Sequence, residues 1–158
     1  MKEFRNILMT AALVITGILV SCGGGGGGEG KTEGQKLIDA LTGTHPVNVT
    51  SSNVTNVEGT PDLTGTSVTL SGNSDDTGMT FTLSGSTINQ YFTGGSFSVS
   101  DAGSISGAML DVNGSASITI SSVSVSTTDT TITISAVVAA DVTRGDGVGN
   151  WTIVFDRS

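Results

Sequence analysis

The sequence predicts an all-β domain, either a single antiparallel barrel or a sandwich, of about eight or nine strands. Apolar and polar residues alternate with a period of two from Val47 to Phe155, as in strands that bury one face. Threonine is abundant there, and its branched side chain packs well on a pleated surface. The segments between the alternating runs are too short for crossover helices, so the strands should be antiparallel.

The chain begins with the features of an export signal. Lys2 and Arg5 precede an apolar stretch over residues 7–20, and the small residue Ser21 follows it. A charged start, a short apolar region and small residues before a cleavage point are typical of a secretory signal peptide. The stretch is shorter than the roughly 20 residues that a helix needs to cross a bilayer. We therefore expect residues 1–21 to be removed, and consider an uncleaved anchor the weaker alternative.

The end of this region, Leu19-Val20-Ser21-Cys22, resembles the lipobox of bacterial lipoproteins. The resemblance implies that Cys22, the only cysteine, becomes the new N-terminus. It would then carry a diacylglyceryl thioether and a further acyl chain, such as palmitate, on its amine. One chain gives marginal membrane binding, whereas two or three hold a protein firmly. Gly23, in place of an aspartate, favours the outer membrane by the same resemblance, on its periplasmic face or at the cell surface.

A glycine-rich tether is expected to follow the acylated Cys22 and to end at residue 32. Residues 23–32 cannot bury apolar surface and should stay disordered. A Gly-rich chain of this length reaches on the order of 17 Å. A phosphate-binding glycine loop would need a preceding strand, and here a signal peptide precedes it.

The composition excludes several kinds of partner. Loss of Lys2, Arg5 and Glu3 with the signal peptide would take the formal net charge from −8 to −9. So acidic a domain has no basic surface for nucleic acid and is not attracted to anionic lipid. The acyl chains must therefore hold the protein on the membrane. The remaining cations are Lys31, Lys36, Arg144 and Arg157.

The β-domain is expected to span residues 33–158 and to open with a helix over residues 33–42. Leu37, Ile38 and Leu41 lie on one apolar stripe, and Gly43 lies just past the end. So short a helix should form only by docking on the domain.

Strands are expected between residues 46 and 157. A four-residue pattern, apolar-Thr-apolar-Ser, recurs at 68–71 and 81–84, and again at 118–121 and 132–135. This recurrence in two pairs predicts two hairpins rather than a solenoid. Residues 72–78 have the composition of a turn. The alternating apolar positions are Val47 and Val49; Val68 and Leu70; Met79, Phe81 and Leu83; Phe97 and Val99; Met109 to Val112; Ile118 and Ile120; Val123 and Val125; Ile132, Ile134, Ala136 and Val138; Trp151, Ile153 and Phe155.

The run Leu41-Thr42-Gly43-Thr44-His45, a short helix leading into a first strand, resembles the opening of lipocalin-like bacterial lipoproteins. That family carries Gly-x-Trp here, followed by an up-and-down antiparallel barrel and a C-terminal arginine that packs on the tryptophan. Gly43 matches, His45 stands at the tryptophan position, and Arg157 would be the arginine. An immunoglobulin-like sandwich stays open as the alternative, although it lacks its cysteine pair and mid-chain tryptophan.

The residues offer little for catalysis, metal binding or a cofactor, and none of these is predicted. His45 is the only histidine, which leaves a nucleophile–base pair or a zinc site without partners. The segment 141–150 contains Asp141, Asp146 and Asn150, which could supply oxygen ligands to calcium. A long loop between the last two strands explains the same composition, and calcium binding is left open.

Three aromatic residues are the candidate contacts for a ligand or partner: Tyr91, Phe92 and Trp151. Adjacent strand residues point to opposite faces, so one of Tyr91 and Phe92 should face outward. Burial of both at a bulge is the alternative.

These observations predict a lipid-anchored protein of the bacterial cell envelope with a non-catalytic β-domain. The leading function is a binding or interaction module, for a small apolar ligand if a barrel forms, or for an envelope protein. A structural surface-coat or adhesion component is the second hypothesis, and an enzyme the third.

Overall fold

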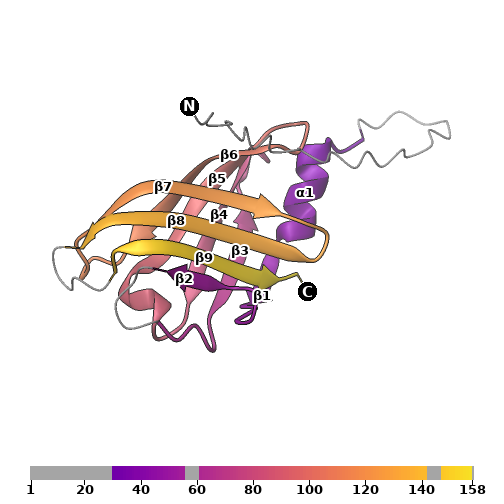
Figure 1. The fold of residues 1–158 in the computed structure, drawn as a ribbon. Helices are drawn as coiled ribbons and strands as arrows, with labels where there is room; N and C mark the ends of the chain where they lie inside the picture. The colour runs from indigo at the N-terminus through magenta and orange to yellow at the C-terminus, as the bar shows by residue number, and fades with distance from the viewer. Residues whose placement is uncertain (1–29, 56–60, 142–146, 158) are drawn as a thin grey trace, which may run out of the picture.

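The computed structural model describes residues 30–55, 61–141 and 147–157. Within them, nine strands form two antiparallel sheets packed on one core (Figure 1). One sheet has the order β1 (Gly43–Pro46), β3 (Ser67–Gly72), β4 (Gly78–Ser84), β5 (Phe92–Val99) and β6 (Ile105–Val112). The other has the order β2 (Asn53–Thr55), β9 (Gly149–Asp156), β8 (Thr131–Asp141) and β7 (Ile118–Thr127). The predicted all-β class is confirmed, and of the two predicted architectures the structure has the sandwich.

The helix α1 (Glu33–Leu41) confirms the predicted helix and covers one end of the sandwich (Figure 1). It begins with a capping box, in which Thr32 Oγ1 accepts from the amide of Gln35 while the Gln35 side chain accepts from the amide of Thr32. Ile38 and Leu41 are buried. We call this the helix end; the opposite end, closed by the 3-10 turn η1 (Ile88–Gln90), is the far end.

Both predicted hairpins are confirmed, since β3 pairs with β4 and β7 pairs with β8. The alternation within each strand sends its apolar residues to the core and its serines and threonines to solvent. The expected turn at residues 72–78 also forms, with the Asn73 amide donating to the Gly78 carbonyl at 2.9 Å.

Two details of the predicted strands are wrong. Val47 and Val49 were expected in a strand, but β1 ends at Pro46, Val47 makes a single bridge to Phe155, and Val49 is 48% exposed. The chain turns there because Asn48 accepts hydrogen bonds from residues that follow it, including the amide of Ser51.

The second difference concerns the runs at 118–120 and 123–125. They belong to one strand, β7, whose register shifts on either side of Ile120. A β-bulge places an extra residue, Ser121, between the two runs, so the apolar side chains of both face inward.

The two sheets meet along two long sides of the sandwich, and the sides differ. Along the closed seam, between β1 and β9, Val47 bridges to Phe155 and the Asn48 amide donates to the Val154 carbonyl at 2.7 Å. Ser52 Oγ accepts from the Val154 amide at 2.9 Å. Along the open seam, β6 and β7 lie side by side, but neither pairs with the other (Figure 1). The up-and-down barrel that the family resemblance implies is therefore not closed.

Candidate functional site

The three aromatic residues singled out by sequence lie together at the far end. The ring centroids of Tyr91 and Trp151 are 4.9 Å apart, and those of Phe92 and Trp151 are 5.3 Å apart in an edge-on arrangement. All three side chains are buried, with exposed fractions of 5% or less. They therefore pack as part of the core and present no aromatic surface to solvent.

Of the two alternatives for Tyr91 and Phe92, burial of both holds, and the outward-facing one is wrong for a local reason. Tyr91 follows η1 with helical backbone angles, φ −115° and ψ −51°, so the alternation of strand side chains begins only at Phe92. The turn folds Tyr91 back over the end of the core, where its ring meets Trp151 from the other sheet.

Next to this cluster lies the segment 141–150, for which calcium binding was left open. Trp151 Nε1 donates to the Gly147 carbonyl at 3.1 Å, and a Cβ on Gly147 would lie 2.6 Å from Asp141 Oδ2. Asp141 is half-buried and Asn150 exposed, while Asp146 and Arg144 lie outside the described residues. The segment joins the antiparallel strands β8 and β9, as the loop explanation expects.

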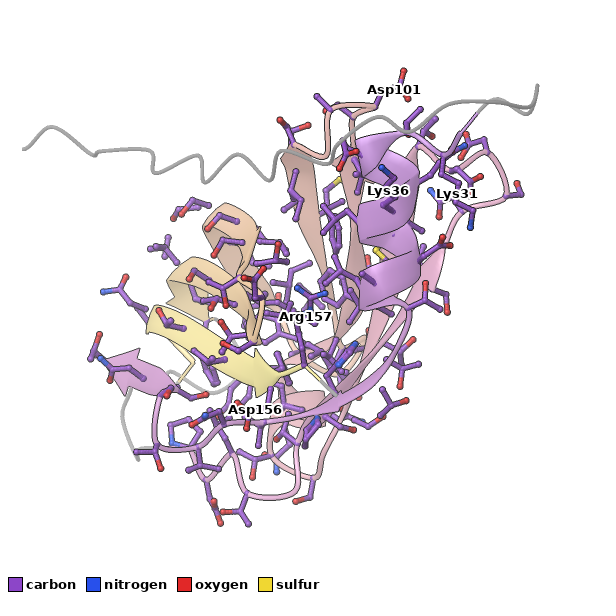
Figure 2. All side chains as sticks on the ribbon, turned by 90° about the vertical axis from the view of Figure 1, so that its right-hand side faces the viewer. Lys31, Lys36, Asp101, Asp156 and Arg157 are labelled. Atoms are coloured by element: carbon purple, nitrogen blue, oxygen red, sulfur yellow. The ribbon has the colours of Figure 1, made fainter. Side chains whose placement is uncertain are left out.

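At the helix end, the structure places the two residues that carry the family resemblance. His45 is buried, with Nε2 2.9 Å from the Leu41 carbonyl in the last turn of α1. The guanidinium of Arg157 donates to the carbonyls of Thr128 and Ala40, at 2.5 and 3.3 Å. Figure 2 shows Arg157 beside the last turn of α1, where a cation complements the helix dipole. Both residues hold α1 against the strands.

Cys22, the expected signal peptide over residues 1–21 and residues 23–29 of the expected tether lie outside the described residues. No helix in the described ranges has the length and apolar character needed to cross a membrane. The same ranges contain no cluster of three or more histidine, cysteine or acidic side chains arranged to hold a metal ion.

The open seam is the surface that sequence reasoning missed. Most apolar residues of β6 and β7 that pack against the core are only partly buried, although Val125 is buried. Their counterparts on β8 and β9, such as Ile134 and Ile153, are 3% and 2% exposed. The partly buried apolar floor of the seam consists of Ile105, Ala108, Leu110, Ile118, Ile120 and Val123. A hollow of about 110 Å³ opens between the two strands over this floor, lined from Ile105 to Ala108 and from Val123 to Val125.

The seam also has two free strand edges. Because β6 and β7 end their sheets, half of their backbone N–H and C=O groups point away from any strand. β7 has ten residues without a charge, glycine or proline, whereas β2, the edge at the other side of its sheet, has three residues. The uncharged run was visible in the sequence; that it would lie at an edge was not.

A second hollow, of about 280 Å³, lies beside the closed seam, with Val49, Val54, Pro61 and Leu63 among its lining residues. At its rim the Thr64 amide donates to Asp62, and this interaction with Thr64 holds the pKa of Asp62 below its usual range. At the helix end, Thr77 lowers the pKa of Asp75 in the same way.

The helix end also carries paired charges. Lys31 pairs with Asp39, which raises the pKa of Lys31, and Lys36 pairs with Glu33 at 2.7 Å. Figure 2 shows both lysines and Asp101 around the first turns of α1. All of these groups are exposed, so they contribute little to stability.

No protein-family model, no curated protein and no solved structure matches this chain. The account of its function therefore depends on its own residues and their geometry.

Proposed function

We propose that this protein is a lipid-anchored component of the bacterial cell envelope whose β-domain is a non-catalytic interaction module. The export signal, the Leu19–Cys22 motif and the glycine run support the anchoring at Cys22. The sandwich supports the second half, because it offers a long free surface along the unpaired edges of β6 and β7.

The observation that carries the proposal is the contrast between a filled interior and an unfinished edge. Trp151, Phe92 and Phe155 fill the space that a lumen would occupy, and each is at most 1% exposed. A small apolar ligand inside the domain is therefore the weaker form of the binding hypothesis. The open seam leaves apolar floor and unpaired backbone within reach of a protein partner.

The position of the tether supports the same function. The chain enters the domain at α1, where the Gly34 amide donates to the Asp101 carbonyl in the turn between β5 and β6. Because the chain enters the domain at the helix end, we expect that end to face the membrane, and both long seams run away from α1 (Figure 1). An acylated chain of this design presents its seams sideways to proteins in the same membrane layer.

The proposal is tested in the bacterial host with the full chain carrying an affinity tag. We expect radiolabelled palmitate to enter the wild-type protein and not Cys22→Ser, and the variant to leave the membrane fraction. Photo-crosslinkers at exposed positions Ser106 and Ser124 should then yield discrete adducts with an envelope protein. If label is absent and fractionation is unchanged, the anchoring fails; if both positions give no adduct, the interaction role fails.

A second candidate function, a surface-coat or adhesion component, is favoured by the outer face of the five-stranded sheet. Thr44, Thr69 and Thr82 stand in one cross-strand row, all exposed, with Thr44 and Thr69 hydroxyls 2.8 Å apart. Protease treatment of intact cells separates the two. A coat component is cleaved from the surface, whereas a periplasmic interaction module is protected.

A further inference from the structure

We propose that the open seam accepts an extended segment of a cationic partner protein, which adds a strand to the edge of β7 and lays its apolar side chains on the seam floor. This inference deepens the proposed interaction function and rests on it. It follows from three independent features: the free edge, the apolar floor, and the carboxylates at both ends.

The edge supplies the backbone hydrogen bonds. β7 has ten residues, which at about 3.3 Å per residue offers an edge of roughly 33 Å. Edge strands that must stay unpaired usually carry lysine, proline, inward charges or a bulge, and of these β7 has only the bulge at Ser121. Beyond that bulge β7 pairs regularly from Ser122 to Thr127, whereas β6 is interrupted at Gly107, with φ +60°, and again near Val112.

The floor supplies side-chain selectivity. In strand addition, main-chain bonds give affinity and alternate side chains enter pockets. The hollow of about 110 Å³ between Ile105 and Val123 is several times the ~10–15 Å³ that one water molecule needs in the same measure, so it has room for an apolar side chain. The seam therefore favours a segment with apolar residues at every second position.

The charges at the ends of the seam indicate which kind of partner segment it would bind. Exposed Asp101 and Asp129 lie in the turns at the helix end of β6 and β7. At the far end, exposed Asp111 lies at the end of β6. The Arg157 guanidinium near the helix end is held by backbone carbonyls. A segment with lysine or arginine at both ends of an uncharged core complements this arrangement.

The same charges argue against a second copy of this chain as the occupant. Without residues 1–21 each copy has a formal net charge of −9, so pairing two seams would bring acidic residues together at both ends. Self-association through β7 is accordingly the alternative that the experiment has to separate.

The test titrates the full chain in detergent with fluorescent peptides and reads anisotropy. One probe has alternating valine and threonine between paired lysines, and its control has the same core between paired glutamates. We expect the lysine probe to bind about tenfold more tightly at low salt, and the difference to shrink near 1 M salt, where the Debye length is about 3 Å. Equal binding of the two probes would overturn the inference.

Two variants locate the binding. Val123→Lys places an inward charge on β7 and should weaken the lysine probe about tenfold or more, whereas Val137→Lys, the same change on the outer face of β8, should not. Asp111→Asn with Asp129→Asn, at exposed positions that leave the core intact, should weaken it several-fold. Circular dichroism checks that each variant is folded.

The remaining outcomes are decisive as well. A wild-type dimer that Val123→Lys dissociates, with no probe bound, overturns the cationic partner in favour of a second copy. An envelope adduct that forms equally in Val123→Lys overturns the seam but leaves the interaction function standing. Absence of any adduct defeats the function itself, so the two failures are distinct.

Discussion

The two seams of this sandwich differ in whether the edges of the two sheets are hydrogen-bonded to each other. At the closed seam the chain passes from β1 in one sheet to β2 in the other. The connecting segment is hydrogen-bonded to β9 through Val47, Asn48 and Ser52. At the open seam β6 and β7 are joined by the turn at 113–117, and their neighbouring edges stay unpaired. Stability is thus concentrated at one side, and surface available for binding at the other.

The difference shows how a small β-domain can keep an edge free without losing its core. The floor of the open seam is only partly buried, while Phe155 beside the closed seam is fully buried. Regions that bind partners are commonly drawn from the less stable part of a fold.

The largest expected effect comes from matched truncations on the two sides. Ile153→Ala on β9 removes a side chain that is 2% exposed and should lower the free energy of unfolding by about 2–5 kcal/mol. Ile120→Ala on β7 removes a half-buried one and should cost less than about half as much. Urea denaturation followed by tryptophan fluorescence measures both. Equal losses would mean that the open seam is as well packed as the closed one.

A smaller effect is expected from one hydroxyl at the closed seam. Ser52→Ala leaves the Val154 amide without its acceptor and should cost about 1–2 kcal/mol. Ser124→Ala, the same change on the exposed face of β7, should stay within about 0.5 kcal/mol. Thermal unfolding of both variants measures these losses. If Ser52→Ala leaves stability unchanged, the bond from the Val154 amide to Ser52 does not stabilise the closed seam.

The bulge at the open seam should respond to a single methyl group. Gly107 has φ +60°, and a Cβ there would meet only the Ser98 hydroxyl, at 3.7 Å. Gly107→Ala should therefore cost about 1 kcal/mol through backbone strain rather than a clash. Gly114→Ala, in the turn that joins the seam strands, has open space and should change stability by less than about 0.5 kcal/mol.

The smallest effect is a dependence on pH beside the closed seam. The pKa of Asp62 is lowered from 3.8 by its interaction with Thr64, so its stabilising contribution is present above 3.8 and is lost as the pH falls through the folded-state pKa. Asp62→Asn should therefore reduce the decrease in the free energy of unfolding that occurs as the pH is lowered. Urea midpoints at about pH 5 and pH 3 measure the slope, and an unchanged slope would rule out this source.

Much of the fold could be predicted because period and turn chemistry act locally. The helix at 33–41 and both hairpins follow from residues that are neighbours in sequence. Val49 was misplaced because Asn48 side-chain bonding outweighed a short apolar alternation. The direction of the Tyr91 side chain could not be predicted from strand alternation, because a 3-10 turn precedes this residue.

The candidate site was harder to predict than the fold. Whether a strand lies inside a sheet or at its edge depends on pairings between distant segments, such as Val47 with Phe155. The uncharged composition of β7 is the same in either position. A closed barrel would need β6 to pair with β7 and the single bridge between Val47 and Phe155 to extend into a ladder, and no local pattern encodes either.

Amide hydrogen exchange along β7, read residue by residue by NMR, tests the open seam most directly. An edge strand pairs only every second amide, so we expect protection to alternate along β7, and the fast amides to slow when the lysine-flanked probe is added. Uniform protection of β7 in the free protein would show that its outer edge is already paired, and would contradict the account.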